Sequence, residues 1–489
     1  MVYNLRKLLE KTMSKNSIYK NFIWKFSERM AAQIVTTIVS IVLARILDPS
    51  DYGTISLITV FIALCNVVMV SGFGNALIQK KNTDTIDFST VFYFNLFFSF
   101  IMYVIIFITA APISRFYSIE ILKPIIRVMG ISVIIASINS VQHAYVSKKM
   151  IFRKFFFSTL FGTILSGIIG VALALCGAGV WSLVAQYMIN LLVDTVVLWI
   201  TVKWYPTKEF SLERLKELFG YGWKLFVSGF LDTGYNQLRT IIIGKIYTAR
   251  DLAYYDQGQK YPQLLITNIN SSISSVLLPT MAKEQNNIDN VKKMTRMAVS
   301  VSSYILWPMM VGMAVIAEPF VRVLLTEKWI FCVPYLRLAC ITFVFWPIHT
   351  ANLEAIKAIG RSDIFLKMEM IKKTIGVIVI IFSLRFGVIG IAVSGVINSI
   401  VGCIINAIPN KINLNYGLKE QLGDILPEII LSVLMGIIIT PIKYVLKDDL
   451  VLLMGQILTG VCFYLMMSIL LKMKSFKYIM RIISSTKEG

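Results

Sequence analysis

Polar side chains recur at helical spacing inside an apolar run near the N-terminus. Arg29, Gln33, Thr36 and Ser40 lie three or four residues apart, so a helix would place them along one face. A guanidinium group beside an amide and two hydroxyls could bind an anion or a sugar. Arg29 is close to the end of the run, where its side chain could instead extend to a polar interface. We therefore weigh a binding face against hydrogen bonding between packed helices.

A second apolar run, which begins near residue 222, repeats this arrangement. Ser228, Asp232, Asn236 and Arg239 again share one helical face. Two matching polar faces are what a hydrophilic cavity between two lobes would need. Hydrogen bonding between helices is again the alternative.

Arginine is the residue type best suited to bind a phosphate within such a cavity, because its planar fork of donors matches phosphate oxygens. Arg127 lies in a third apolar run and joins Arg29 and Arg239 as a candidate phosphate ligand. Asn268 belongs to a stretch rich in amides and hydroxyls, which could bind sugars or pack helices closely. The predicted substrate-binding residues are Arg29, Gln33, Arg127, Asn236, Arg239 and Asn268.

Carboxylates inside apolar runs could bind a coupling ion, because burying such a group is costly unless it has a role. Asp232 and Asp194 are the two candidates, for a proton or a sodium ion. Both histidines of the chain, His143 and His349, also fall in apolar runs. Glu318 and Arg322 are four residues apart, and we interpret them as a structural ion pair. We expect no metal site and no cofactor beyond the coupling ion.

The composition shows what must position these residues. The 489 residues are 56% hydrophobic and only 15% charged, with a mean hydropathy of +0.72. Soluble domains are about 25% charged, and a membrane-spanning helix needs about 20 apolar residues. We predict an all-α polytopic membrane protein of about fourteen transmembrane helices. The predicted spans are residues 21–46, 53–78, 88–112, 122–147, 155–177, 179–202, 222–247, 257–281, 296–325, 333–357, 368–386, 387–408, 425–446 and 450–471. The breaks at 177–179 and 386–387 are very short, which predicts tight helical hairpins that turn at Gly177 and Gly179 and at Gly387 and Gly390.

The charge distribution predicts the orientation. The net charge of +21 would suggest nucleic-acid binding in a soluble protein, but most Lys and Arg residues fall on alternate loops of this map. Basic loops face the cytoplasm. We therefore expect both termini to be cytoplasmic and no nucleic-acid partner. The first 20 residues are polar and basic, which predicts that the first span itself directs insertion. The six cysteines have no metal-site or redox-motif spacing and read as small apolar residues.

Two matches in the same order indicate an internal duplication. Residues 41–46 resemble 241–246, and Gly179 leading to Asn190 resembles Gly387 leading to Asn398. A repeat of six helices gives two lobes of the same orientation. The predicted parts are an N-terminal six-helix lobe (1–207), a cytoplasmic amphipathic linker (208–221), a C-terminal six-helix lobe (222–410), and an additional helix pair with a basic cytoplasmic tail (411–489).

Diffuse but ordered motifs resemble one transporter superfamily across residues 20–410. They are Leu-Ala-Arg-Ile-Leu-Asp-Pro-Ser-Asp-Tyr-Gly at 43–53, Gly-Phe-Gly at 72–74, Ala-Leu-Ile-Gln at 76–79, Leu-Pro at 278–279, Ala-Glu-Pro at 317–319 and Trp329. The chain is similar to the polysaccharide and lipopolysaccharide exporter branch of the multidrug/oligosaccharidyl-lipid/polysaccharide superfamily. That resemblance implies alternating access and an oligosaccharide on polyprenyl pyrophosphate as cargo, moved from the inner to the outer leaflet for surface polysaccharide biosynthesis. It makes membrane lipids, a polysaccharide polymerase and glycosyltransferases the expected partners.

Three other functions compete with this reading. An enzyme would need catalytic or nucleotide-binding motifs that the sequence lacks, so we expect the protein not to be an enzyme. A drug/cation antiporter of the same superfamily is the main alternative, although an arginine-lined cavity would repel cations. A structural scaffold would not need two polar faces. Where related proteins often carry an acidic residue, this chain has Arg239, which leaves Asp232 and Asp194 as the carboxylates for ion coupling.

Overall fold

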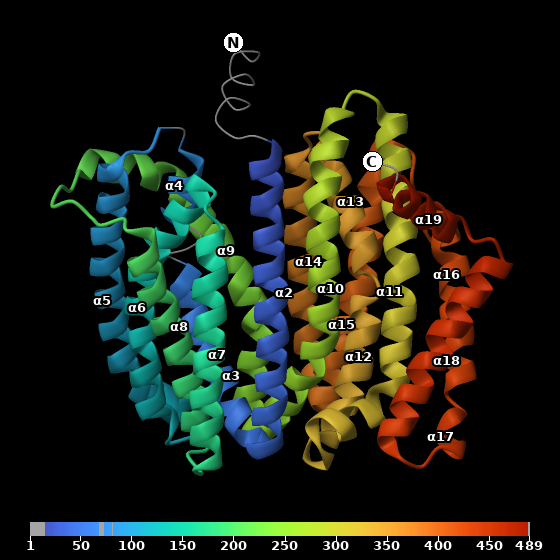
Figure 1. Cartoon of the computed structure of the whole chain (residues 1–489), viewed down its shortest axis with the longest axis horizontal. Coiled ribbons are helices and arrows are strands. Elements are labelled where there is room, and N and C mark those ends of the chain that lie inside the picture. The colour runs from blue at the N-terminus through green and yellow to red at the C-terminus, as the bar shows by residue number, and fades with distance from the viewer. Residues whose placement is uncertain (1–14, 68–72, 81, 488–489) are drawn as a thin grey trace. The chain divides into compact units, whose positions relative to one another are not determined.

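The computed structural model describes residues 15–67, 73–80 and 82–487, with only the backbone given for 15–30, 221 and 481–487. This part of the chain consists of helices joined by short turns, with no strand (Figure 1). Eleven of its segments are long and apolar enough to cross a membrane, and Ala31–Ile46 is a shorter apolar stretch. The predicted all-α class is confirmed, and each of the fourteen predicted spans overlaps a helix. The count of fourteen crossings stays a prediction.

The chain divides into two compact units, and the first comprises residues 1–253. Within the first unit, α7 packs along α8, α5 along α6, and α2 against α7. The helices are α2 (Lys15–Ile46), α3 (Pro49–Val67), α4 (Asn75–Gln79), α5 (Thr85–Tyr117), α6 (Leu122–Lys149), α7 (Arg153–Leu175), α8 (Val180–Val202) and α9 (Leu212–Ile246).

The turn between α7 and α8 confirms a predicted helical hairpin. Gly177 and Gly179 have φ angles of 79° and 53°, a backbone region that glycine adopts at no steric cost. Close packing of α2 on α7 depends on another glycine. A Cβ atom at Gly167 would lie 2.5 Å from a methyl carbon of Val39, so only a hydrogen fits there.

The second unit comprises residues 254–489, and α10 runs into it from the first. Helix α11 packs on α16, α12 and α18, and α14 forms a second hairpin with α15. That hairpin turns at Gly387 (φ 72°), as predicted, whereas Gly390 lies within α15. The helices are α10 (Ala249–Lys283), α11 (Ile288–Leu325), η2 (Glu327–Cys332), α12 (Val333–Phe343), α13 (Trp346–Ala358), α14 (Ser362–Ser383), η3 (Leu384–Phe386), α15 (Gly387–Leu414), α16 (Leu418–Ile439), α17 (Ile442–Val445), α18 (Asp449–Leu470) and α19 (Lys474–Lys487).

The structure differs from the predicted elements at three points. The amphipathic linker is not a separate helix from residue 212 onward, because α9 runs unbroken from Leu212 to Ile246. The predicted span 333–357 is two helices, and α13 begins with Pro347 in its first turn, where proline's missing donor costs nothing. Span 53–78 is divided between α3 and α4. The four predicted parts of the chain stay a prediction.

Candidate functional site

The polar face of α9 carries three of the predicted site residues. The Asn236 side-chain amide donates to Oδ2 of Asp232 at 3.2 Å, one helical turn away. Arg239 lies seven residues after Asp232, on the same face. Its Nε is buried and has no hydrogen-bond partner among the described residues. The face therefore offers a guanidinium donor beside a carboxylate and an amide, which suits a ligand with phosphate and hydroxyl groups.

The other predicted face, on α2, is described in part. The Gln33 amide reaches the hydroxyl of Thr37 at 3.5 Å, and that hydroxyl donates to the Gln33 carbonyl at 2.8 Å. Gln33 thus bonds along its own helix. The side chain of Arg29 lies outside the described residues.

Arg127 stands against an aromatic ring. Its guanidinium carbon is 4.1 Å from the ring centre of Phe107 on α5, a cation–π contact. Its Nε is buried without a hydrogen-bond partner among the described residues. The ring occupies one face of the guanidinium group, so the donors along its edge remain available for an anion.

Asp194 on α8 lies in a cluster that spans three helices. Its Oδ2 accepts from the amide of Asn139 at 2.6 Å and lies 3.1 Å from Nε2 of His143, both on α6. The ring of Phe155 on α7 stacks on His143 with centres 4.7 Å apart. Sequence reasoning selected the aspartate but missed these partners, because they are far from it along the chain.

Asn268 lines a groove in the second unit. The groove has a volume of about 390 Å³ and lies between α10 and α11, where Ser272 and Ser302 are its other polar residues. The Asn268 amide donates to the Leu264 carbonyl at 3.0 Å, so one of its donors is used within its own helix. The groove is mostly apolar, which fits a lipid chain better than a sugar.

The predicted ion pair of Glu318 and Arg322 is confirmed, with Nη2 and Oε1 3.0 Å apart. Arg322 also contacts Glu327 at 3.1 Å. The pair lines a pocket of about 610 Å³ in the second unit that also includes Arg337 and Lys443. Because Arg322 already has carboxylate partners, we assign it to structure rather than to the substrate.

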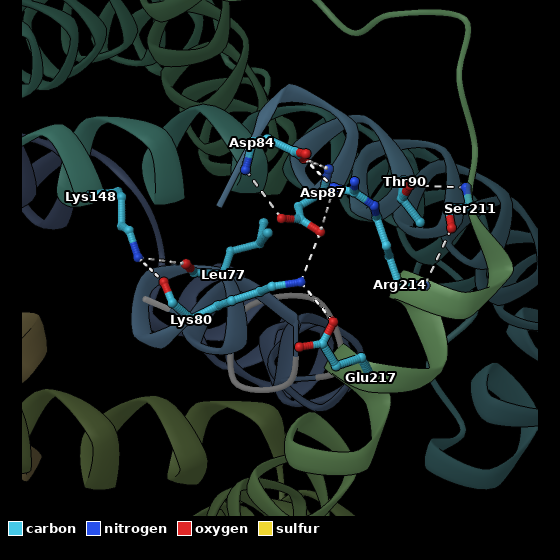
Figure 2. A network of polar contacts seen from close by, with 9 residues as sticks. All are labelled: Leu77, Lys80, Asp84, Asp87, Thr90, Lys148, Ser211, Arg214 and Glu217. Carbon is cyan, nitrogen blue, oxygen red and sulfur yellow. Dashed lines mark hydrogen bonds and ion pairs between the residues drawn. The ribbon is translucent and has the colours of Figure 1, made fainter. Parts of the chain in front are cut away.

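A charged cluster that the sequence did not reveal holds the start of α9 against α4 and α5 (Figure 2). We call its five residues the clasp: Lys80, Asp84, Asp87, Arg214 and Glu217. Lys80 Nζ lies 3.1 Å from Asp87 and 2.7 Å from Glu217, and Arg214 bridges Asp84 and Asp87. Asp84 and Asp87 also form a capping box at the first turn of α5. The clasp therefore fixes where α9, with its polar face, begins.

Apolar packing reinforces the clasp. Leu218 on α9 is buried among Phe73, Phe88 and Trp204, and Leu215 packs beside it. Nearby, Lys148 on α6 donates to the carbonyl of Ile78 at 2.9 Å. The amphipathic pattern of the linker thus faces a protein core, which explains why its residues join α9.

The ion pairs of the clasp contribute their full stability near neutral pH. The pKa of Asp84 is lowered, chiefly by the hydrogen bond from Arg214, so its stabilising contribution is lost as pH falls through that lowered value. Burial acts to lower the pKa of Lys80, but Glu217 and Asp87 outweigh it and the pKa is raised. The contribution of Lys80 is therefore lost only as pH rises through the raised pKa.

Replacing Asp87 by asparagine should destabilise the protein by about 2 kcal/mol, because two cations lose a carboxylate whose side chain is 1% exposed. The measurement is the unfolding temperature of the purified full-length chain in detergent. Asp363→Asn is the matched control, since that carboxylate is 53% exposed beside Arg361 and its loss should shift the unfolding temperature far less. Equal shifts in the two variants would contradict a structural role for the clasp.

Comparison with known proteins shows which family the chain belongs to. A family model described as polysaccharide biosynthesis protein matches residues 42–334, more than half of the 489 residues. The chain belongs to this family. The match runs from the end of α2 into the start of α12, so it includes the polar face of α9 and the cluster around Asp194.

Relatives of this family member are named for polysaccharide and lipopolysaccharide biosynthesis. It is 22% identical to the succinoglycan biosynthesis transport protein ExoT of Rhizobium meliloti, over 74% of this chain and 73% of that protein. It is 24% identical to the lipopolysaccharide biosynthesis protein WzxC of Escherichia coli, over 68% of each. Its fold resembles that of the lipid II flippase MurJ in an inward closed conformation, with a TM-score of 0.73, 17% identity, and 93% and 99% of the two chains covered. The predicted family resemblance is confirmed, and this family member is a multi-pass membrane protein.

Proposed function

We propose that this protein is a flippase for an oligosaccharide linked to polyprenyl pyrophosphate. It moves this lipid from the inner to the outer leaflet of the bacterial cell membrane by alternating access, for surface polysaccharide biosynthesis. Both termini and the basic loops lie on the cytoplasmic side. The observation that carries the proposal is membership of the polysaccharide biosynthesis family over a segment that contains the polar face of α9.

Two buried arginine nitrogens support the binding of the cargo's head group in this path. Arg239 and Arg127 each hold a buried Nε that lacks a hydrogen-bond partner among the described residues, and a pyrophosphate supplies acceptors for such donors. Asn236 beside Asp232 supplies the neutral and charged groups that bind sugar hydroxyls. A proton or sodium ion bound at Asp194 or Asp232 provides the energy. We assign Arg29, Gln33 and Asn268 to the same path, with the polymerase and glycosyltransferases acting on the cargo before and after it.

A drug/cation antiporter is the second candidate, favoured by the carboxylate of Asp232 on the polar face. Two arginines with available donors weigh against it, because a permanent positive charge repels cations and attracts phosphates. The same polar groups have no arrangement of nucleophile, base and oxyanion donors, so we propose transport rather than catalysis.

Deleting the gene tests the proposal directly. The expected result is loss of surface polysaccharide with accumulation of the lipid-linked oligosaccharide in the inner leaflet, both reversed by the wild-type gene. Drug susceptibility is measured in the same strains. Normal surface polysaccharide together with increased drug sensitivity would overturn the flippase and favour the antiporter.

A further inference from the structure

The two histidines of the chain occupy corresponding places in the two copies of the predicted repeat. His143 lies on α6 and faces α8, whereas His349 lies on α13 and faces α15. The repeat aligns Gly179 with Gly387 and Asn190 with Asn398, so that α8 corresponds to α15. Along this alignment, Asp194 corresponds to Gly402. The two copies therefore place an imidazole opposite a carboxylate in one case and opposite a glycine in the other.

His143 has the partners of an ionisable site. Its Nε2 is 3.1 Å from Oδ2 of Asp194, and the Asn139 amide donates to the same oxygen. An ionised carboxylate only accepts hydrogen bonds, so Nε2 must carry the hydrogen and Nδ1 of the neutral ring keeps its lone pair. The His143 side chain is 45% exposed and that of Asp194 only 14%. The ring is therefore the more accessible of the two groups.

His349 contacts only neutral side chains, and the charge that acts on its ring is the cation of Lys372. Asn406 Nδ2 lies 3.0 Å from its Nδ1, and the Ser399 hydroxyl lies 3.4 Å from its Nε2. A Cβ atom at Gly402 would lie 2.9 Å from the ring, so the ring occupies the space that a side chain there would need. No carboxylate among the described residues bonds to this histidine. Positive charge on His349 would therefore lack the compensation that Asp194 gives to His143.

We propose that His143 and Asp194 form the proton-binding site that couples transport, and that the corresponding site at His349 stays neutral. This inference rests on the proposed flippase function. The neutral ring with ionised Asp194 has a net charge of −1. A proton from water binds Nδ1, giving an imidazolium–carboxylate pair of net charge zero, and its release restores −1. Because a net charge within a span is costly, proton binding stabilises the contact of α6 with α8, and proton release weakens it.

The helices packed around His143 carry other ionisable groups, both within the helices and near their ends. On α6 they are Lys123, Arg127, Tyr145, Lys148 and Lys149; on α7, Arg153 and Lys154; on α8, Tyr187; on α3, Asp51, Tyr52 and Cys65; and on α5, Asp87, Tyr93, Tyr103, Arg115 and Tyr117. Lys154 bonds to the carbonyl of Thr201, and Lys148 bonds to carbonyls near Ile78. Asp87 belongs to the clasp. Asp194 is thus the carboxylate that bonds to His143.

The two histidines make the site directly observable. The full-length chain is labelled with ¹⁵N-histidine, reconstituted in lipid nanodiscs and titrated by NMR, and His349→Gln identifies the remaining signal as His143. We expect His143 to titrate and His349 to stay neutral over the same pH range. In Asp194→Asn, the proton affinity of His143 should fall by about tenfold or more, because the neighbouring negative charge is removed. Asp194→Glu should restore it, which separates charge from a loss of folding.

Two outcomes would overturn the proposal. One is an unchanged His143 titration in Asp194→Asn, and the other is equal titration of both histidines. Replacing potassium chloride by sodium chloride is the ion control, and a weaker proton affinity in sodium would assign the site to sodium instead. Surface polysaccharide is measured in the same variants. If the deletion strain makes normal polysaccharide, the flippase function fails while the NMR result still decides the proton site.

Discussion

Replacing Arg239 by glutamine is expected to lower surface polysaccharide by roughly tenfold to a hundredfold at unchanged protein level. Its Nε is buried on the polar face of α9 without a hydrogen-bond partner among the described residues, and under the proposed function it donates to the cargo's phosphates. Hydrogen bonds to charged groups contribute about 1.5–3 kcal/mol, which corresponds to that range. Export is measured by complementation of the deletion strain, with membrane levels compared by immunoblot.

Two controls separate the proposed role from general damage. Arg239→Lys keeps the charge but loses the fork of donors, so it should recover only part of the export. Arg361→Gln is the matched control, because Arg361 is 49% exposed and pairs with the neighbouring Asp363. Its replacement should leave export unchanged. Wild-type export from Arg239→Gln would remove this residue from the substrate path.

The sequence predicted helices and hairpins well because their signals are local. Apolar length marked every span, and the glycines at 177, 179 and 387 marked two turns whose backbone angles require them. These features depend on residues adjacent along the chain. An apolar run, however, does not show whether its helix crosses the whole membrane. Apolar length therefore predicts the all-α class but not the number of crossings.

The elements that were predicted wrongly depend on distant packing. The linker at 208–221 and the span from residue 222 were predicted as separate elements. The helix continues through them because Leu218 is buried against α5 and the segment before α9, which the pattern alone could not reveal. Span 333–357 was predicted as one helix, but Pro347 lies in the first turn of a new helix, α13.

The candidate site was predicted as single residues rather than as clusters. Asp194, Asp232 and Arg239 were selected because polar groups are costly in apolar runs. The pairing of Asp194 with His143 joins positions that are 51 residues apart, and the contact of Lys80 with Glu217 joins positions 137 apart. Helical periodicity carries no information on such distances. The aligned histidines would have been the best available signal, had the repeat been extended to α6 and α13.

Alanine at Gly53 is expected to lower the stability of the full-length chain by about 3 kcal/mol or more. A Cβ atom there would lie 1.7 Å from the carbonyl oxygen of Ala249, where α3 meets the start of α10 within the first unit. Backbone cannot rotate away as a flexible side chain can, so the two helices must separate. Overpacking of this kind costs about 1–3 kcal/mol even where side chains can adjust. The unfolding temperature of the detergent-purified protein measures it.

Gly423→Ala in α16 is the matched control, because nothing lies within 4 Å of a Cβ there. It should be neutral or stabilising by about 0.5–1 kcal/mol, since alanine favours the helix. Asp48→Asn tests whether charge also holds this end of the unit, where Arg250 contacts Asp48 at 3.2 Å with both side chains about half exposed. An exposed pair contributes about 0–1 kcal/mol, so its loss should be small. A larger effect from Asp48→Asn than from Gly53→Ala would mean that the ion pair, rather than the close backbone contact, joins α3 to α10.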